Sequence, residues 1–251
     1  MTTLSGQVAV VTGSSRGIGA AIALRLAGAG ARVAIHGRDG AALEAVRTRI
    51  ASAGADVIAM TAELSDAGAI EAMRDEVESR LGPVDILVAN AGGSPVRPGP
   101  VEEISAEDWD ASVRMNLTTT FLTIRAFLPG MKQRGRGAII TMSSAAARRP
   151  GPMSPIAYAA AKAAIELLSK DVAAQAGPYG VRVNCIAPET IMTEGNESAI
   201  PQQIRQSLID NHPVRRLGTP EDVADAALFL AADTSSWISG VVLDVAGGSV
   251  L

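Results

Sequence analysis

Two side chains with complementary proton chemistry, Tyr158 and Lys162, lie four positions apart in the sequence. On a helix this spacing puts a phenol and an ammonium on one face, one turn apart. A neighbouring ammonium stabilises the phenolate and lowers the tyrosine pKa from its usual value of about 10. Such a phenol can exchange a proton with an alcohol or a ketone while a nearby serine holds the carbonyl oxygen. The pattern predicts carbonyl–alcohol interconversion, which still requires a hydride source.

A glycine-rich turn near the N-terminus is the expected place for the hydride carrier. Residues 8–12 form a short apolar run that indicates a buried strand, and Gly13, Gly17 and Gly19 follow it. An apolar helical segment then continues through Ala27. In this context the glycines let the backbone approach a pyrophosphate, which the free N–H groups and dipole of the helix N-terminus attract. The turn therefore predicts a dinucleotide site.

Strand-like runs alternate with helical patterns along the chain. They occur at residues 8–12, 32–36, 57–61, 86–89, 138–142, 182–186 and 241–245. Alternating β and α segments predict an α/β fold, a single doubly wound Rossmann-type domain over residues 1–251 with a seven-stranded parallel sheet flanked by helices. Right-handed crossovers then place ligands at the carboxyl ends of the strands. The longest irregular region, residues 188–201, precedes a short helical segment ending near Asn211 and is expected to be a lid or binding loop.

Taken together, the motifs resemble those of the short-chain dehydrogenase/reductase family. The motifs are Thr12-Gly13-x3-Gly17-x-Gly19, Asn90-Ala91-Gly92, Asn116, Ser144, Tyr158-x3-Lys162, Pro220-Glu221 and Gly247-Gly248. The resemblance covers nearly the whole chain and is strongest to 3-oxoacyl-acyl-carrier-protein reductase-type members. It implies an oxidoreductase acting on CH–OH groups with a nicotinamide cofactor, and a substrate loop over about residues 188–215.

The resemblance also implies which residues are catalytic: Asn116, Ser144, Tyr158 and Lys162. Tyr158 would be the proton donor and acceptor, Lys162 would hold the nicotinamide ribose, and Asn116 would support a water relay. Ser144 lies 14 residues before Tyr158, which is one residue more than the commonest spacing in the family. Ser143 and Ser154 therefore remain alternatives for the serine that holds the carbonyl oxygen.

The end of the second strand bears on the choice of cofactor. Dinucleotide folds that select NAD place a carboxylate here, on the ribose hydroxyls. By the family pattern that acid would fall at Gly37; Arg38 follows it, and Arg16 lies in the glycine turn. Two guanidinium groups could clamp a 2′-phosphate. We therefore predict NADP, used as NADPH, although two merely solvated arginines remain an alternative.

The cofactor contacts expected from the turn and the resemblance extend over several loops. They are Gly13, Ser15, Arg16, Gly17, Ile18, Gly19, Arg38, Glu63, Leu64, Asn90, Ala91, Gly92, Tyr158, Lys162, Ile191 and Thr193. Two positions depart from the family pattern nearby. Glu63 replaces an aspartate beside the adenine, and Glu189 replaces a frequent glycine beside the nicotinamide.

Composition excludes several classes of function. The 251 residues are 47% hydrophobic and carry a net charge of −4, which argues against nucleic acid as a partner. No apolar run approaches the ~20 residues that span a membrane. A single cysteine, Cys185, excludes an intrachain disulfide, and His36 and His212 lack metal-ligand spacing, so no metal is expected. These features favour a cytoplasmic location.

The expected partner is a small-molecule carbonyl or alcohol substrate, with an acyl thioester as one option. The basic cluster of Lys132, Arg134 and Arg136 is interpreted first as a solvated helix terminus, and second as a contact for an acidic carrier protein. Long helices over residues 105–133 and 157–176 commonly form a four-helix contact in the family, which implies a homotetramer. Two other functions compete with this one. The first is epimerisation or dehydration on the same scaffold, and the second is that of a catalytically silent, cofactor-binding sensor.

Overall fold

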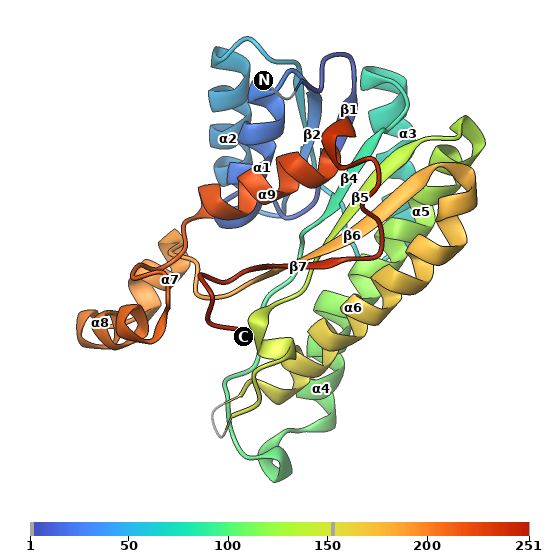
Figure 1. Ribbon diagram of the computed structural model, residues 1–251. Helices are drawn as coiled ribbons and strands as arrows, with labels where there is room; N and C mark the ends of the chain where they lie inside the picture. Colours follow the sequence, from blue (N-terminus) through green and yellow to red (C-terminus); the bar gives the residue numbers. More distant parts are fainter. Residues whose placement is uncertain (1–2, 152–153, 251) are drawn as a thin grey trace.

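A single parallel sheet organises the molecule, for which a computed structural model describes residues 3–151 and 154–250 (Figure 1). Its strands are β1 (Val8–Val11), β2 (Arg32–His36), β3 (Val57–Met60), β4 (Ile86–Ala89), β5 (Gly137–Met142), β6 (Val181–Pro188) and β7 (Val242–Val245). All adjacent strands pair in parallel in the order β3-β2-β1-β4-β5-β6-β7. The prediction of a seven-stranded, doubly wound Rossmann-type sheet is confirmed.

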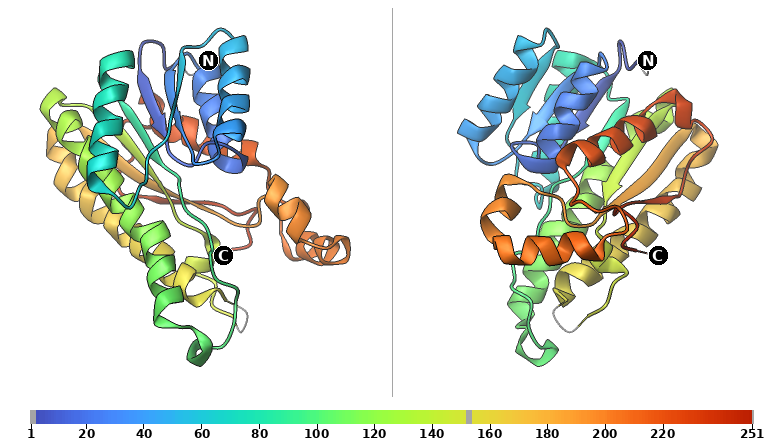
Figure 2. Two further views of the ribbon diagram at one scale, coloured as in Figure 1. Left: turned by 180° about the vertical axis from the view of Figure 1, so that it is seen from behind. Right: turned by 60° about the vertical axis from the view of Figure 1, so that its left-hand side comes forward.

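Helices cover both faces of this sheet (Figures 1 and 2). One face carries α1 (Gly17–Gly28), α2 (Gly40–Ser52) and α9 (Pro220–Ala231), and the other carries α3 (Ala67–Leu81), α5 (Thr119–Arg134) and α6 (Ile156–Ala176). Strand side chains alternate between the faces, so Val11 packs in one hydrophobic cluster and Val10 in the other. Burial on both faces explains why the strands are continuous apolar runs.

The strand order reverses between β1 and β4, and the loops after these strands lie side by side. The Thr12 hydroxyl joins them by accepting hydrogen bonds from the backbone N–H groups of Asn90 and Ala91, at 3.0 and 3.1 Å. Such a reversal opens a crevice at the carboxyl ends of the strands, where open α/β sheets bind ligands. The fold thus places the glycine turn and the Asn90 segment at one site.

The helix expected over residues 105–133 contains an interruption. The structure has α4 (Ala106–Val113), a π-helical turn η2 (Arg114–Thr118), and then α5. A π turn adds a residue to the helical repeat and occurs frequently at functional sites. Asn116 lies in this turn, so the distortion determines where its side chain points. By contrast, α6 spans almost the expected residues.

The region after β6 is more ordered than the sequence indicated. The expectation of an irregular segment over residues 188–201 is wrong in part, because α7 (Glu194–Ala199) begins there, capped by the Thr193 hydroxyl. It is followed by α8 (Gln202–Asn211), and both helices project from the body of the domain (Figure 2). Within the described residues, no helix is long and apolar enough to cross a membrane.

Short 3-10 helices complete the described elements. They are η1 (Val101–Glu103), η3 (Ala145–Ala147), η4 (Gly177–Tyr179) and η5 (Asp233–Ser235). The one that matters for the site is η3, because it begins immediately after Ser144 and fixes the position of that serine.

Candidate active site

A cleft of about 1030 Å³ runs along the carboxyl ends of β1, β4, β5 and β6. Most of the expected site residues line it: Gly13, Arg16, Gly17, Ile18, Gly19, Asn90, Gly92, Ser144, Tyr158, Lys162, Ile191 and Thr193. Of the remaining expected contacts, Ser15, Arg38, Glu63, Leu64, Ala91 and Asn116 are not among its lining residues. The fold therefore brings the glycine turn and the tyrosine–lysine pair, far apart in sequence, into one cavity.

The glycine turn leaves space for a ligand because its glycines carry no side chains. Gly13 has a φ of +64°, and a Cβ on it would lie 2.8 Å from the Ala91 Cα. A Cβ on Gly19 would lie 2.2 Å from the Gly13 carbonyl oxygen. The Asn90 amide holds the turn by donating to the carbonyls of Thr12 and Gly13, both at 3.0 Å. Exposed backbone at the N-terminus of α1 fits the pyrophosphate of a dinucleotide.

His36 organises the same turn. The sequence interpretation placed it either near the cofactor adenosine or at the surface, and the structure buries it. Its Nδ1 accepts a hydrogen bond from the Gly13 N–H at 3.3 Å, and its Nε2 faces the Ala62 carbonyl at 3.0 Å. The ring is therefore neutral, with its proton on Nε2. Burial lowers the pKa of His36, and this outweighs the opposing effect of the Ala62 hydrogen bond. The imidazole thus ties the ends of β1, β2 and β3 together.

The tyrosine and the lysine lie in the cleft as expected, but the tyrosine pKa shifts in the opposite direction to the expectation. Burial raises the pKa of Tyr158, and a hydrogen bond with Ser144 only partly offsets this. The Lys162 Nζ lies 5.5 Å from the centre of the Tyr158 ring and donates to the Met142 carbonyl at 2.8 Å. Desolvation therefore sets the direction of the Tyr158 shift, and Lys162 is not among its causes. Burial also lowers the pKa of Lys162, to about 8.

Local hydrogen bonds distinguish the candidate serines. The Ser144 hydroxyl accepts from the Ala146 N–H at 3.2 Å, which holds it at the start of η3, facing the cleft. The Ser143 hydroxyl is buried and bonded to Glu166 Oε1 at 2.7 Å and to the Lys162 carbonyl. Ser154 also lines the cleft. Ser144 faces the cleft and is the one of the three whose hydroxyl lowers the pKa of Tyr158, so its position favours it for the substrate oxygen.

Asn116 acts on the backbone beside the lysine. Its fully buried amide accepts from the Gly93 N–H at 3.1 Å and donates to the Gly93 and Ser112 carbonyls. A Cβ on Gly92 would lie 2.6 Å from the Asn116 Oδ1 and 3.4 Å from the Lys162 Nζ. Gly92, in the loop after β4, therefore lies in the cleft wall close to both Asn116 of the π turn and Lys162 of α6.

The match to known proteins agrees with this arrangement. Residues 13–249 match the family model described as "Enoyl-(Acyl carrier protein) reductase". The 7alpha-hydroxysteroid dehydrogenase of Escherichia coli K12 is 36% identical over 247 residues, covering 98% of this chain and 95% of the relative. The chain belongs to the short-chain dehydrogenase/reductase family.

Solved structures of this family resemble the whole chain and carry different cofactors. A 7alpha-hydroxysteroid dehydrogenase complexed with NADH and 7-oxo glycochenodeoxycholic acid has a TM-score of 0.94, with 36% identity and coverage of 99% and 96% of the two chains. A Brucella melitensis 3-oxoacyl-[acyl-carrier protein] reductase with bound NAD has a TM-score of 0.91, with 35% identity and 99% and 93% coverage. A Burkholderia cenocepacia gluconate 5-dehydrogenase in complex with NADP and tartrate has a TM-score of 0.91, with 33% identity and 98% and 96% coverage. The chain is therefore a nicotinamide-dependent type of oxidoreductase for alcohols and ketones.

The adenosine end of the cleft differs in detail from the expectation. Arg16 pairs with Asp39, a carboxylate that the sequence interpretation did not include and that also caps α2. Glu63 accepts hydrogen bonds from the backbone and hydroxyl of Ser65, at 3.0 and 2.9 Å, so its carboxylate serves a local turn. A Cβ on Gly37 would lie 2.9 Å from the Ser15 Cβ. Close packing with Ser15 therefore disfavours an acidic side chain at that position.

Three charged residues on the substrate side of the cleft were also missed as a group: Arg149, Glu189 and His212. Glu189 was noticed only as a departure from the family pattern. Its carboxylate contacts both other residues, through Arg149 Nη1 at 3.5 Å and His212 Nε2 at 2.6 Å. Loop conformations set these contacts, so sequence spacing carried no signal for them. In the described residues, no group of three or more His, Cys, Asp and Glu side chains could hold a metal ion.

Proposed function

We propose that this protein is an NADP(H)-dependent oxidoreductase that interconverts a ketone and a secondary alcohol. The observation that carries the proposal is the meeting of Tyr158, Ser144 and Lys162 with the glycine turn in one cleft. The ketone could also be the 3-oxo group of an acyl thioester, as the resemblance to 3-oxoacyl reductases implies. Asn116, Ser144, Tyr158 and Lys162 are all present, which disfavours a catalytically silent sensor. These four side chains indicate no specific step of an epimerisation or a dehydration.

The cofactor, when bound, supplies or accepts the hydride at the carbonyl carbon. In reduction, Tyr158 gives its phenolic proton to the carbonyl oxygen as the C–H bond forms, and water restores that proton. Ser144 donates a hydrogen bond to the same oxygen and stabilises its developing charge. Lys162 would hold the ribose hydroxyls of the bound cofactor, and Asn116, which orders the backbone at Gly93, would support the water relay. A tyrosine pKa raised by burial keeps the phenol protonated, which suits its role as the acid.

The choice of NADP(H) rests on the charges at the adenosine end. No carboxylate stands at Gly37, where Ser15 packs closely, and Arg38 follows directly. Arg16 reaches the same region and can exchange its contact with the exposed Asp39 for a 2′-phosphate. An exposed ion pair contributes little free energy, so this exchange has a small cost.

Steady-state kinetics with NADPH and NADH across a panel of ketones tests both parts of the proposal. We expect turnover with a higher kcat/KM for NADPH, and Arg38→Ala should reduce the NADPH advantage by about 10-fold or more because a charge-assisted contact is lost. A preference for NADH that Arg38→Ala leaves unchanged would overturn the NADP assignment. Binding of cofactor without oxidation of NADPH by any ketone would instead favour the sensor.

Two larger features belong to the same proposal. We propose that residues 188–215, which include α7 and α8, form the substrate loop of the 1–251 domain, because Thr193, Asn196 and Asn211 line the cleft. We also propose a homotetramer. Large apolar side chains are exposed on α5, α6 and the segment before β7, where Phe121, Leu167 and Trp237 are 47, 62 and 99% accessible.

A further inference from the structure

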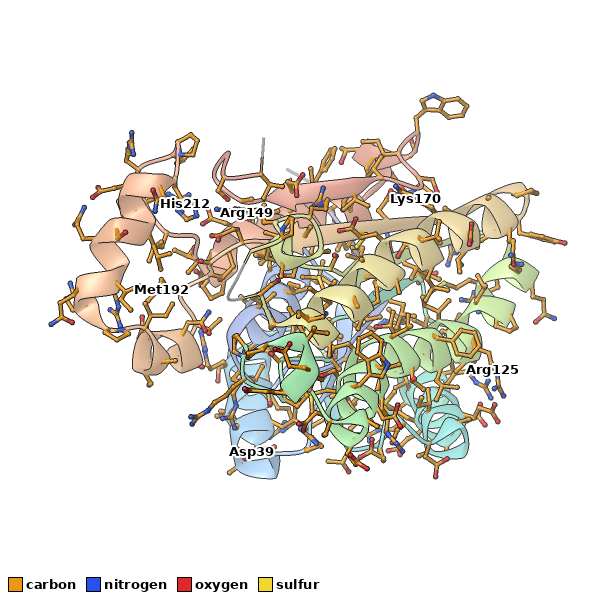
Figure 3. All side chains as sticks on the ribbon, turned by 90° about the horizontal axis from the view of Figure 1, so that it is seen from below. Asp39, Arg125, Arg149, Lys170, Met192 and His212 are labelled. Atoms are coloured by element: carbon orange, nitrogen blue, oxygen red, sulfur yellow. The ribbon has the colours of Figure 1, made fainter. Side chains whose placement is uncertain are left out.

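The substrate side of the cleft has a charged wall built by three separate loops. Arg149 follows η3, Glu189 follows β6, and His212 follows α8, and all three line the cleft. Figure 3 shows the Arg149 and His212 side chains side by side, between α8 and the body of the domain. This wall lies in the same cavity as Tyr158.

Glu189 is committed to His212. Its Oε2 lies 2.6 Å from the His212 Nε2, and the same oxygen accepts a hydrogen bond from the Thr190 N–H. His212 is buried, and its Nδ1 lies 2.6 Å from the Leu208 carbonyl. An oxygen atom therefore lies within hydrogen-bond distance of each ring nitrogen. The Oε2 atom of Glu189 therefore already has two partners, the His212 ring and the Thr190 N–H.

Among residues 3–151 and 154–250, the side chain of Arg149 has one ionic partner, the other oxygen of this carboxylate. Its Nη1 is 3.5 Å from Glu189 Oε1, a long contact, and the side chain remains 49% exposed. Its neighbour Arg148 is held by Asp244 and Glu166 instead. Among the described residues that line the cleft, the only other acidic side chain is Glu194. The guanidinium of Arg149 thus makes one long contact and lies half-exposed next to the open cleft.

Polar groups suited to an anion surround this charge. Ser154, Asn196 and Asn211 line the same cavity. A guanidinium presents parallel N–H donors that match a carboxylate bidentately. A single guanidinium carries one positive charge, which matches a carboxylate monoanion better than a phosphate dianion. The cleft therefore offers a carboxylate position at one end and a carbonyl position, at Ser144 and Tyr158, at the other.

We propose that Arg149 is a specificity-determining residue that binds a carboxylate of the substrate, so that the substrate is an oxo acid or the corresponding hydroxy acid. Glu189 and His212 hold the guanidinium in place and carry the end of α8 against it. This proposal rests on the reductase function proposed above, and it narrows the ketone to one that bears a carboxylate.

Matched substrates test this assignment. Oxo acids of four to eight carbons are compared with their primary amides, which have the same shape without the charge, at saturating NADPH. For the best pair we expect the acid to have a kcat/KM at least 10-fold higher. Arg149→Gln should lower kcat/KM for the acid by roughly 10- to 100-fold, mainly through KM, because a hydrogen-bonded charge contact is lost. The amide should change by less than about twofold, and Arg149→Lys should recover part of the acid preference.

The control removes the same charge outside the cleft and outside the proposed substrate loop. Arg49→Gln alters an exposed arginine of α2 that is absent from the cleft lining, and it should leave the acid-to-amide ratio unchanged. Equal use of acids and amides by the wild type, or an equal loss for both with Arg149→Gln, would overturn the carboxylate assignment while the reductase function stands.

Calorimetry on the NADP⁺ complex separates this proposal from the function on which it rests. If neither series is reduced, the reductase proposal fails, but binding of the same acids and amides remains measurable. Tighter binding of an acid than of its amide, lost in Arg149→Gln and retained in Arg49→Gln, would support the carboxylate position. Absence of any difference between acids and amides would refute it.

Discussion

At the scale of single residues, burial dominates the titration of the catalytic pair. Lys162 is 4% accessible and its pKa falls to about 8, while burial raises the pKa of Tyr158. Both shifts favour the neutral form, as desolvation requires. Tyr158 is therefore prepared as a proton donor, and a positive charge from oxidised cofactor would have to stabilise its phenolate in the reverse reaction.

Tyr158→Phe tests the proton transfer directly. The substitution keeps the ring in its packing site and removes only the hydroxyl, so we expect kcat to fall by about 10²–10⁴-fold. Cofactor affinity, measured by NADPH fluorescence, should change little. Wild-type turnover in this variant would refute the proposed acid.

Lys162 predicts a pH limit for cofactor binding. Its ammonium loses a proton as pH rises through about 8, and a neutral amine holds ribose hydroxyls less strongly. We expect the Kd for NADPH to increase above that pH. Titrations between about pH 6 and 10 check this, with Lys162→Met as the comparison. A matching rise in the Lys162→Met variant would assign the effect to another group.

At the scale of elements, His36 links three strand ends through its neutral ring. Because burial lowers its pKa below 6.5, the unfolded chain binds this proton more readily than the folded one. The contribution of His36 to stability is therefore complete above about pH 6.5 and is lost as pH falls toward the folded-state pKa. Protonation also places an N–H on Nδ1 opposite the Gly13 N–H and breaks that contact.

Urea unfolding of the wild type and His36→Gln measures this link. Glutamine can offer a donor and an acceptor but does not titrate, so the decrease in stability from about pH 7 to 5.5 should be smaller in the variant. Equal slopes for the two proteins would show that the acid sensitivity comes from other groups.

At the scale of the whole molecule, the exposed apolar side chains predict where copies associate. Phe121 on α5 and Leu167 on α6 lie on helices expected to form a four-helix contact, and Trp237 stands before β7. Light scattering should give the mass of four chains. Because a buried charge without a partner is costly, Phe121→Asp should reduce that mass, whereas Val101→Asp, an exposed control on η1, should not. A wild-type monomer would contradict the tetramer.

The sequence alone determined the features that depend on local pattern. Apolar β-branched runs predicted the strands, alternation predicted the parallel sheet, and the glycine spacing predicted the turn after β1, because each is a property of neighbouring residues. The tyrosine–lysine spacing likewise located the acid and its lysine on one helix, α6. These predictions required no knowledge of how distant segments pack.

Tertiary structure decided what depends on distance and desolvation. Burial reversed the expected direction of the Tyr158 pKa shift, and the contacts of Asp39 with Arg16 and of His212 with Glu189 join residues more than 20 positions apart. The π turn at Asn116 and helix α7 also escaped the sequence pattern. The pKa of a buried group and the conformation of a loop depend on all the residues that surround them in the folded protein. These surroundings form only when distant segments of the chain come together around the cleft.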